Sequence, residues 1–259
     1  MNHCLLQILQ PTLKREDHQH NLTTLLEMVP KRLVQKTEAS FLVLPELFFR
    51  TEDRIGYERF IREIATMSGA CVIGGSLHTD WHGKKVNTGI VADPDGEIIG
   101  RYFKNNPYGP EVKQGIKGVP GLCQFSWRGW RGAVVICADA WDSRLLNRLQ
   151  EPPDLLFIVA ESVSEEHGPV AARSLWHSLA VARAFELTSV VAISDWGEGK
   201  TRDGDWTCGV GGMANPADPT GVFHPIPPEE SSRLFTIDRE GLKRHREARR
   251  SRSFYWFKK

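Results

Sequence analysis

The sequence lacks several features that would assign it to a membrane, to nucleic acid or to the secretory pathway. No apolar run reaches the roughly 18 residues that a membrane-spanning helix needs. The N-terminus has no basic segment followed by a long apolar core, and its first apolar stretch soon meets Pro11. Lys and Arg total 33 against 32 Asp and Glu, so charge favours neither nucleic acid nor an anionic membrane as a partner. We therefore expect a cytoplasmic protein.

Cysteine usage also excludes some classes. The five cysteines are odd in number and include no Cys-x-x-Cys pair. Cys4, Cys71 and Cys137 lie in or beside apolar runs. This pattern argues against a disulfide framework or a zinc site and favours a reducing compartment. No glycine-rich loop that could cradle a phosphate is present, so a kinase or methyl-transfer function has no support.

The chain reads as one domain over residues 1–259, because no linker, repeat or low-complexity run divides it. Apolar runs predict strands that alternate with amphipathic helices, and Asp93–Gly96 is a strong turn signal between two of the strands. Pro30 should kink or end the first helix. The expected helices cover 21–34, 57–65, 143–149 and 171–186, and the expected strands cover 4–9, 41–44, 71–77, 86–92, 97–103, 122–125, 132–136, 154–159, 189–193, 209–214 and 234–237. This order predicts a mixed sheet, or two sheets, with helices outside.

The last residues, 243–259, form a basic C-terminal arm with eight Lys or Arg and one Glu. A solvated helix followed by a terminal arm explains this composition. An arm that reaches a partner subunit would also fit, because Phe254–Phe257 is a large apolar area to leave in water.

Three ionisable residues share one position in the pattern, directly after a predicted strand. Glu46 follows the strand at 41–44, Lys104 follows the strand at 97–103, and Cys137 follows the strand at 132–136. Strand ends are where α/β proteins place their chemistry. If these strands are parallel or adjacent, the three side chains can converge in one pocket.

Such a trio suits attack on a carbon–nitrogen bond. A thiolate is the nucleophile, a carboxylate can take the thiol proton and return it to the leaving amine, and an ammonium can hold the oxyanion. The alternative is a Glu46–Lys104 ion pair beside a cysteine that only packs, since free cysteine is commonly buried. The trio alone does not decide between them.

Three segments resemble the signature segments of the nitrilase superfamily of carbon–nitrogen hydrolases. They are Phe41–Phe48, Gly100–Lys104 and Val135–Asp139, in the family's order and at strand ends. Glu111, with Val119–Gly121 after it, looks like the segment that carries the family's second glutamate. The resemblance extends to further landmarks at Gly74–Ser76, Asn87–Thr88, Asp93–Gly96, Ala182–Glu186, Gly211–Pro216, and Asp238 with Arg249 and Arg250.

This resemblance implies a four-layer αββα sandwich with two mixed sheets, assembled into homodimers or larger homo-oligomers. It implies a catalytic Glu46, Lys104 and Cys137, with Glu111 as an orienting carboxylate and the backbone N–H of Ala138 as a second oxyanion donor. It implies no metal and no organic cofactor.

The residues after the cysteine bear on the substrate. The nitrilase branch usually carries Trp-Glu there, whereas Ala138-Asp139 is more similar to amidases, so we expect a small-molecule amide. The spacing of Cys137, Asp139 and Trp141 also resembles, locally, the glutaminase domain of glutamine-dependent NAD synthetases. Hydrolysis of a nitrile or an N-carbamoyl compound, and a non-catalytic binding or scaffold role, remain alternatives.

Several aromatic or polar residues are candidates for contact with the substrate, although each could instead belong to the core. These candidates are Phe48, Tyr108, Trp141, Glu161, Trp176 and Trp196. Glu161 follows the strand at 154–159 and is the expected polar specificity residue. A Cys–His pair is a weaker alternative, because His177 lies near the apolar face of a predicted helix and His167 lies in a Gly-Pro loop.

Overall fold

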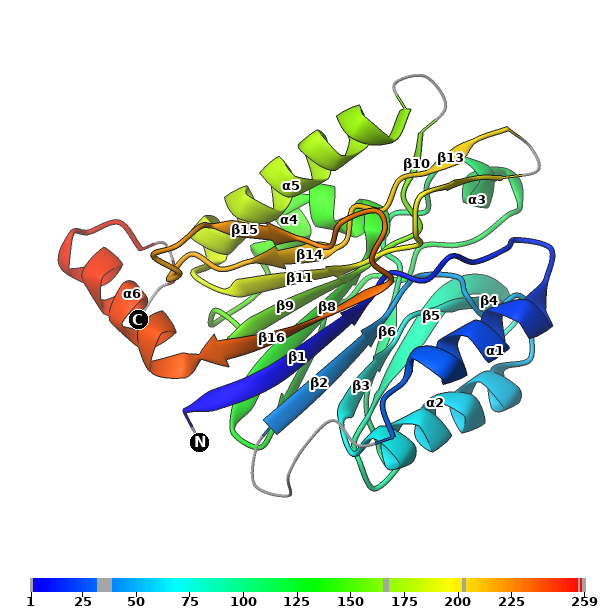
Figure 1. Ribbon diagram of the computed structural model, residues 1–259, viewed down its shortest axis with the longest axis horizontal. Coiled ribbons are helices and arrows are strands. Elements are labelled where there is room, and N and C mark those ends of the chain that lie inside the picture. The colour runs from blue at the N-terminus through cyan, green and yellow to red at the C-terminus, as the bar shows by residue number, and fades with distance from the viewer. Residues whose placement is uncertain (1, 32–38, 165–167, 202–203, 256, 258–259) are drawn as a thin grey trace.

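The computed structural model describes residues 2–31, 39–164, 168–201, 204–255 and 257, which form two stacked sheets with helices outside (Figure 1). The first sheet has the order β16–β1–β2–β3–β5–β4, with β6 paired to β5. In it β1, β2 and β3 are parallel, and the other pairings are antiparallel. Its strands are β1 (His3–Leu9), β2 (Ala39–Leu44), β3 (Cys71–Gly74), β4 (Leu77–Trp81), β5 (Lys84–Ala92), β6 (Ile98–Phe103) and β16 (Ser232–Asp238).

The second sheet has the order β15–β14–β11–β9–β8–β7. Its central strands β8, β9 and β11 are parallel, and β9 and β11 are wholly buried. Burial on both faces explains why these strands read as continuous apolar runs. The strands are β7 (Cys123–Trp127), β8 (Trp130–Ile136), β9 (Leu155–Val159), β11 (Val190–Ser194), β14 (Gly212–Ala214) and β15 (Phe223–Pro225). A third, small sheet joins β10 (Val163–Ser164), β13 (Trp206–Thr207) and β12 (Gly199–Lys200).

Helices cover the outer faces of both large sheets (Figure 1). Apolar residues of α1 and α2 pack with the outward-facing residues of the first sheet, and α5 packs against β11 and β14 of the second. Between the sheets, Phe41 of β2 meets Phe157 of β9 with ring centroids 5.6 Å apart. The expected αββα sandwich is confirmed. The helices are α1 (His18–Met28), α2 (Arg54–Ser68), α3 (Pro110–Lys113), the 3₁₀ helix η1 (Cys137–Trp141), α4 (Ser143–Leu146), α5 (Gly168–Leu187) and α6 (Arg239–Ser251).

Four expected elements differ clearly from the structure. The expected helix at 143–149 ends at Leu146, and the expected strand at 209–214 begins only at Gly212. The other two differences have a clear physical reason. The first helix starts at His18 and ends at Met28, because Pro30 cannot continue it, and residues 32–34 of the expected range lie outside the described residues. The expected strand at 71–77 divides into β3 and β4 at Gly75, whose φ is +62°. A Cβ at Gly75 would lie 2.1 Å from the carbonyl oxygen of Pro45, so glycine allows this close approach.

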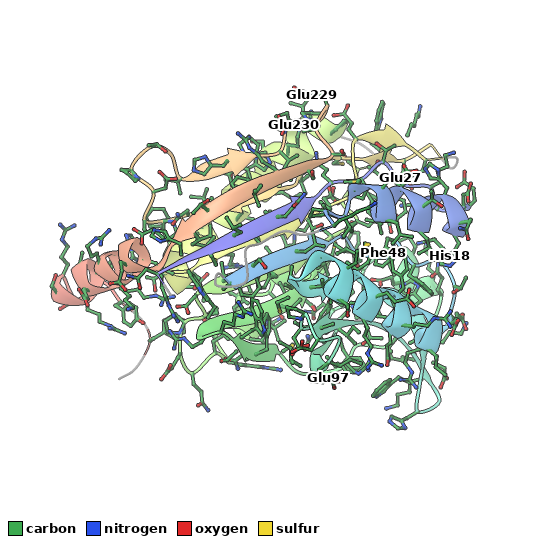
Figure 2. The ribbon with its side chains drawn as sticks, turned by 60° about the horizontal axis from the view of Figure 1, so that its bottom comes forward. His18, Glu27, Phe48, Glu97, Glu229 and Glu230 are labelled. Atoms are coloured by element: carbon green, nitrogen blue, oxygen red, sulfur yellow. The ribbon has the colours of Figure 1, made fainter. Side chains whose placement is uncertain are left out.

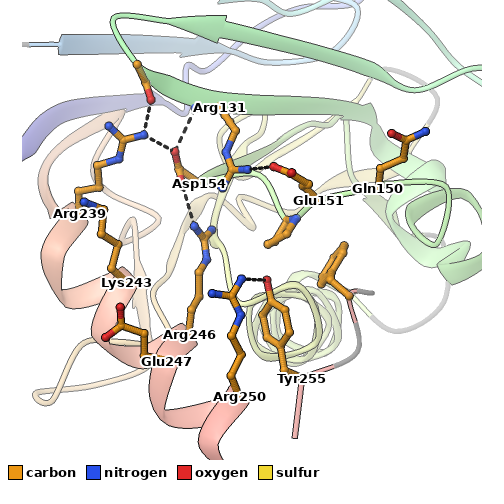
Figure 3. Close-up of a pocket in the computed structure, with 13 residues that line it drawn as sticks. Arg131, Gln150, Glu151, Asp154, Arg239, Lys243, Arg246, Glu247, Arg250 and Tyr255 are labelled. Carbon is orange, nitrogen blue, oxygen red and sulfur yellow. Dashed lines mark hydrogen bonds and ion pairs between the residues drawn. The ribbon is translucent and has the colours of Figure 1, made fainter. Parts of the chain in front are cut away.

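A buried carboxylate fastens α6 to the second sheet (Figure 3). Asp154 is 2% exposed, and it pairs with Arg246 at 2.7 Å, Arg239 at 2.9 Å and Arg131 at 3.6 Å. Arg246 also donates to the carbonyl oxygens of Thr188 and Pro153. Asp154 and these three arginines help to line a cavity of about 500 Å³ beside the C-terminal helix, and none of the expected catalytic residues lines it. Among the described residues, no helix has the length and hydropathy to cross a membrane.

We predict that Asp154→Ala lowers the free energy of unfolding by about 3–5 kcal/mol, because it leaves the buried Arg246 without its anion. Chemical denaturation with urea measures this change. Glu63→Ala is the matched control, since its pair with Arg59 is 4.0 Å long and both side chains are more than two-thirds exposed. The control should change the free energy by less than about 1 kcal/mol. Equal effects of the two substitutions would contradict the prediction.

Candidate active site

A buried cluster of charges lies at the ends of β2 and β6 and at the start of α3. Lys104, the residue after β6, places its Nζ 2.8 Å from Oε1 of Glu46 and 2.6 Å from Oε2 of Glu111. Glu46 follows β2, and Glu111 lies in α3. Their exposed fractions are 1% for Glu46, 3% for Lys104 and 6% for Glu111. Three of the expected catalytic side chains therefore meet.

Cys137 reaches this cluster from the other sheet. It follows β8 directly and opens η1, and its φ of +46° is unusual for a residue other than glycine. The Glu46 carboxylate and the Lys104 ammonium are the charged groups that act most strongly on its thiol. The strands before Glu46 and Lys104, β2 and β6, belong to the first sheet but are not neighbours in it. The strand before Cys137, β8, belongs to the second sheet. The side chains converge because the two sheets stack.

Burial and charge set the protonation of the cluster. Burial raises the pKa of Cys137, and the carboxylate of Glu46 raises it further, so the resting sulfur is a thiol. Burial also raises the pKa of Glu46, although the Lys104 ammonium opposes this shift. For Lys104, burial would lower the pKa, but the carboxylates of Glu46 and Glu111 outweigh it and raise the pKa. Burial would raise the pKa of Glu111, but hydrogen bonds from His78 and Lys104 lower it to about 2.

Two side chains that the sequence reasoning did not assign to the site hold the carboxylates. Nδ2 of Asn87, in β5, donates to Glu46 Oε1 at 2.9 Å and to Glu111 Oε1 at 2.8 Å. Nε2 of His78, in β4, lies 3.0 Å from Glu111 Oε1. The sequence could have indicated Asn87, because a polar amide in the middle of a buried strand needs a hydrogen-bond partner. His78 lies among mostly polar residues, Ser76 to Asp80, and gave no such indication.

Asp139 anchors the turn between Lys104 and α3. Its carboxylate is fully buried and accepts hydrogen bonds from the backbone N–H of Asn105 at 2.9 Å and of Asn106 at 2.8 Å. Because Asp139 lies two residues after Cys137, these bonds fix the cysteine loop of the second sheet to Lys104 of the first. Ala138, between them, is partly exposed.

The expected substrate contacts divide into two groups. Trp141 is 48% exposed and meets the buried Trp176 edge to face, with ring centroids 5.5 Å apart. Tyr108 is 63% exposed, and its backbone N–H donates to Glu111. Tyr108 and Trp141 lie within four residues of Glu111 and Cys137 in the chain, and Trp176 contacts Trp141, so all three stay candidates for substrate contact.

Phe48 and Trp196 do not fit that role. Phe48 is fully buried in the core beneath α1 and α2, where it packs against Tyr57 and Phe60 (Figure 2). Trp196 is 1% exposed, and its Nε1–H donates to the carbonyl oxygen of Glu46 at 2.7 Å. Both rings are enclosed by their packing, so the structure gives no support to a contact between either ring and a substrate.

Glu161 lies against the cluster with its side chain already paired. Its backbone N–H donates to Oε2 of Glu46 at 3.0 Å. Its carboxylate accepts a hydrogen bond from Nε of Arg15 at 2.7 Å and lies 3.9 Å from Arg50. A substrate group that binds Glu161 would therefore meet an ion pair rather than a free carboxylate.

Of the two histidines in the alternative Cys–His pair, only His177 lies among the described residues. The ring of His177 stacks on Phe223 with centroids 4.0 Å apart, and burial lowers its pKa to about 4. His167 lies outside the described residues. All five cysteines are free. Within the part of the chain that the structure describes, His, Cys, Asp and Glu side chains form no group of three that could hold a metal ion.

Comparison with known proteins identifies the family and the fold. The sequence profile of the carbon-nitrogen hydrolase family matches residues 5–209, so the chain belongs to that family. No curated protein matches the sequence significantly. The structures of three other proteins superpose over nearly their whole length.

The first is XC1258 from Xanthomonas campestris, described as a CN-hydrolase superfamily protein, with 20% identity, a TM-score of 0.77, and 96% of this chain and 95% of that one covered. The second is Nit3 of Saccharomyces cerevisiae, from branch 10 of the nitrilase superfamily, with 17% identity, a TM-score of 0.77, and 95% and 94% covered. The third is an amidase from Nesterenkonia sp., with 22% identity, a TM-score of 0.72, and 98% and 97% covered. At these identities the likeness concerns the fold.

Proposed function

We propose that this carbon–nitrogen hydrolase is a thiol-dependent amidase, which converts a small-molecule amide into a carboxylic acid and ammonia. The observation that carries the proposal is a buried cluster in which the Cys137 thiol of the second sheet faces a carboxylate and an ammonium of the first sheet. An ion pair that served stability alone would not need a cysteine in a left-handed conformation at its side.

Each group has a step in the reaction. Glu46, whose pKa is raised, takes the proton of the Cys137 thiol as the sulfur attacks the amide carbon. The Lys104 ammonium and the N–H of Ala138 stabilise the oxyanion. Glu46 then gives its proton to the nitrogen as ammonia leaves, which produces a thioester. Water, deprotonated by Glu46, hydrolyses the thioester and restores the thiol.

Glu111 has a supporting role in this scheme. It accepts the second hydrogen bond of Lys104 and holds the ammonium in place, while His78 and Asn87 keep Glu111 ionised. Its low pKa means that Glu111 does not compete with Glu46 for the thiol proton. The two glutamates thus have different pKa values, and only Glu46 is poised to carry the proton.

An amide is favoured over a nitrile for two reasons. The pair Ala138-Asp139 is more similar to the residues after the cysteine in amidases than to the Trp-Glu pair of the nitrilase branch. The Nesterenkonia amidase also shares the fold. The small exposed fraction of Cys137, 9%, favours a small substrate over a folded polypeptide.

The test is ammonia release from a panel of small aliphatic amides, ω-amides of dicarboxylic acids, N-carbamoyl amino acids and nitriles. We expect release from at least one amide, with none from nitriles. Release from a nitrile or a carbamoyl compound alone would replace the amidase assignment. If no compound reacts while the protein is folded and Cys137 resists a thiol-alkylating reagent, the hydrolase proposal fails and a binding role replaces it.

A further inference from the structure

The segment after β9, Ala160–Ser162, holds the catalytic candidate Glu46 at two points. The N–H of Glu46 donates to the carbonyl oxygen of Ala160 at 3.2 Å, and the N–H of Glu161 donates to Oε2 of Glu46 at 3.0 Å. Glu46 belongs to the first sheet, whereas this segment continues a strand of the second. These bonds therefore fix the carboxylate relative to the sheet that carries Cys137.

The same segment is itself held by Asp195, the residue after β11. Asp195 is fully buried, and Oδ1 accepts the N–H of Ser162 at 2.8 Å. Oδ2 accepts the hydroxyl of Ser162 and the N–H of Val210, the latter at 2.9 Å. Three donors converge on one carboxylate, an arrangement that suits its ionised form.

The next residue, Trp196, holds the other side of Glu46. Its Nε1–H donates to the carbonyl oxygen of Glu46 at 2.7 Å, and the indole is almost wholly buried. The backbone of Glu46 is thus bonded through both its N–H and its C=O to the second sheet. The adjacent Leu47 has a φ of +51°, a strained conformation that the bonds to the Glu46 backbone help to hold.

We propose that Asp195 and Trp196 are positioning residues for Glu46, which lock its carboxylate opposite the Cys137 thiol. Asp195 acts through Ser162 and the N–H of Glu161, and Trp196 acts through the Glu46 carbonyl group. The inference rests on the proposed function, because positioning has a kinetic meaning only if Glu46 transfers the proton. Neither residue touches the substrate in this arrangement.

The charge of Asp195 adds a second effect on the site. Burial raises its pKa to about 7, although hydrogen bonds from Ser162 and Val210 oppose this shift. The titratable groups that sense its charge are the thiols of Cys137, at the end of β8, and of Cys208, before β14, and both thiol pKa values are raised by it. Lys104, Glu111 and Glu161 are the charged groups that act on Glu46.

The test compares Asp195→Asn and Trp196→Phe with the wild type on the best amide of the panel. An asparagine amide would turn an N–H donor toward a backbone N–H, so the bond from Glu161 to Glu46 weakens. We expect Asp195→Asn to lower kcat by about 10–100-fold with KM within threefold, as displacement of a catalytic group by about an ångström would. Trp196→Phe should lower kcat by at least about fivefold, again with KM unchanged.

The pH profile separates positioning from a loss of stability. Loss of a hydrogen bond to the ionised Glu46 raises its pKa, so the acid limb of kcat/KM should move to higher pH in Asp195→Asn. Ser189→Ala is the matched control, because this buried hydroxyl donates to the carbonyl oxygen of Pro153 at the opposite end of β11. The control should lower the melting temperature and leave both kcat and the acid limb unchanged.

Two results would overturn the inference. One is wild-type kcat in both folded variants, and the other is a fall in kcat with the acid limb unmoved, which is the behaviour of general loosening. Cys137→Ala is assayed in parallel to keep the two proposals apart. If that variant still releases ammonia, the proposed function fails and the inference fails with it. If it releases none, wild-type kcat in the Asp195 and Trp196 variants defeats the inference and leaves the proposed function intact.

Discussion

Replacement of Cys137 by alanine is expected to lower kcat/KM for the amide substrate by at least about 10⁴-fold, because no other group can form the acyl intermediate. The side chain is small and buried, so the fold should survive. Ammonia release under saturating and limiting substrate measures the loss. Cys137→Ser should lose nearly as much, because Glu46 would have to deprotonate an alcohol instead of a thiol.

Cys123→Ala is the matched control for this experiment. Cys123 is partly exposed at the start of β7, in the second sheet, away from the charge cluster. Its replacement should leave the rate within about twofold. Mass spectrometry of the wild type during turnover should also show an acyl adduct on the Cys137 peptide. A Cys137→Ala enzyme that keeps more than one-hundredth of the wild-type rate would remove Cys137 from the mechanism.

Replacement of Lys104 by alanine should damage both catalysis and stability. In the proposed mechanism the substitution removes one oxyanion donor, for which a loss of about 10²–10³-fold in kcat is typical. It also leaves Glu46 and Glu111 buried without their shared cation, which costs about 3–5 kcal/mol of unfolding free energy. Without the ammonium the pKa of Glu46 should rise further, and the acid limb of kcat/KM should move to higher pH.

Lys85→Ala is the matched control, because this lysine makes an exposed ion pair of 2.7 Å with Glu52. It should change the unfolding free energy by less than about 1 kcal/mol and leave kcat unchanged. Urea denaturation and steady-state kinetics on the two variants give both quantities. If Lys104→Ala keeps a rate within threefold of the wild type, the lysine has no part in the chemistry.

The aromatic residues show where sequence reasoning was least informative. Phe48, Trp141 and Trp196 are large, apolar residues near a strand end, and the sequence treats them alike. In the structure Phe48 fills the core under α2, Trp196 bonds the Glu46 backbone, and Trp141 is half exposed. The driving force for burial is the same for a core ring and a pocket ring, so only the neighbours in space distinguish them.

The sequence by itself determined the local features of this protein. Apolar runs set β2 and β8, and the ionisable residue after each run set the position of Glu46 and Cys137 at a strand end. Pro30 set the limit of α1, and Asp93–Gly96 set the turn between β5 and β6. These outcomes depend on backbone geometry and side-chain spacing within a few residues, which a linear pattern contains.

Only the tertiary structure decided how those ends meet. Cys137 comes from one sheet and Glu46 from the other. Asn87 of β5 bonds Glu46 directly, and Asp195, after β11, holds the segment that bonds it. Stacking of two sheets is driven by burial of apolar area, which has no preferred direction along the chain. The bonds that cross between the sheets then select one alignment, because a buried polar group without a partner is costly.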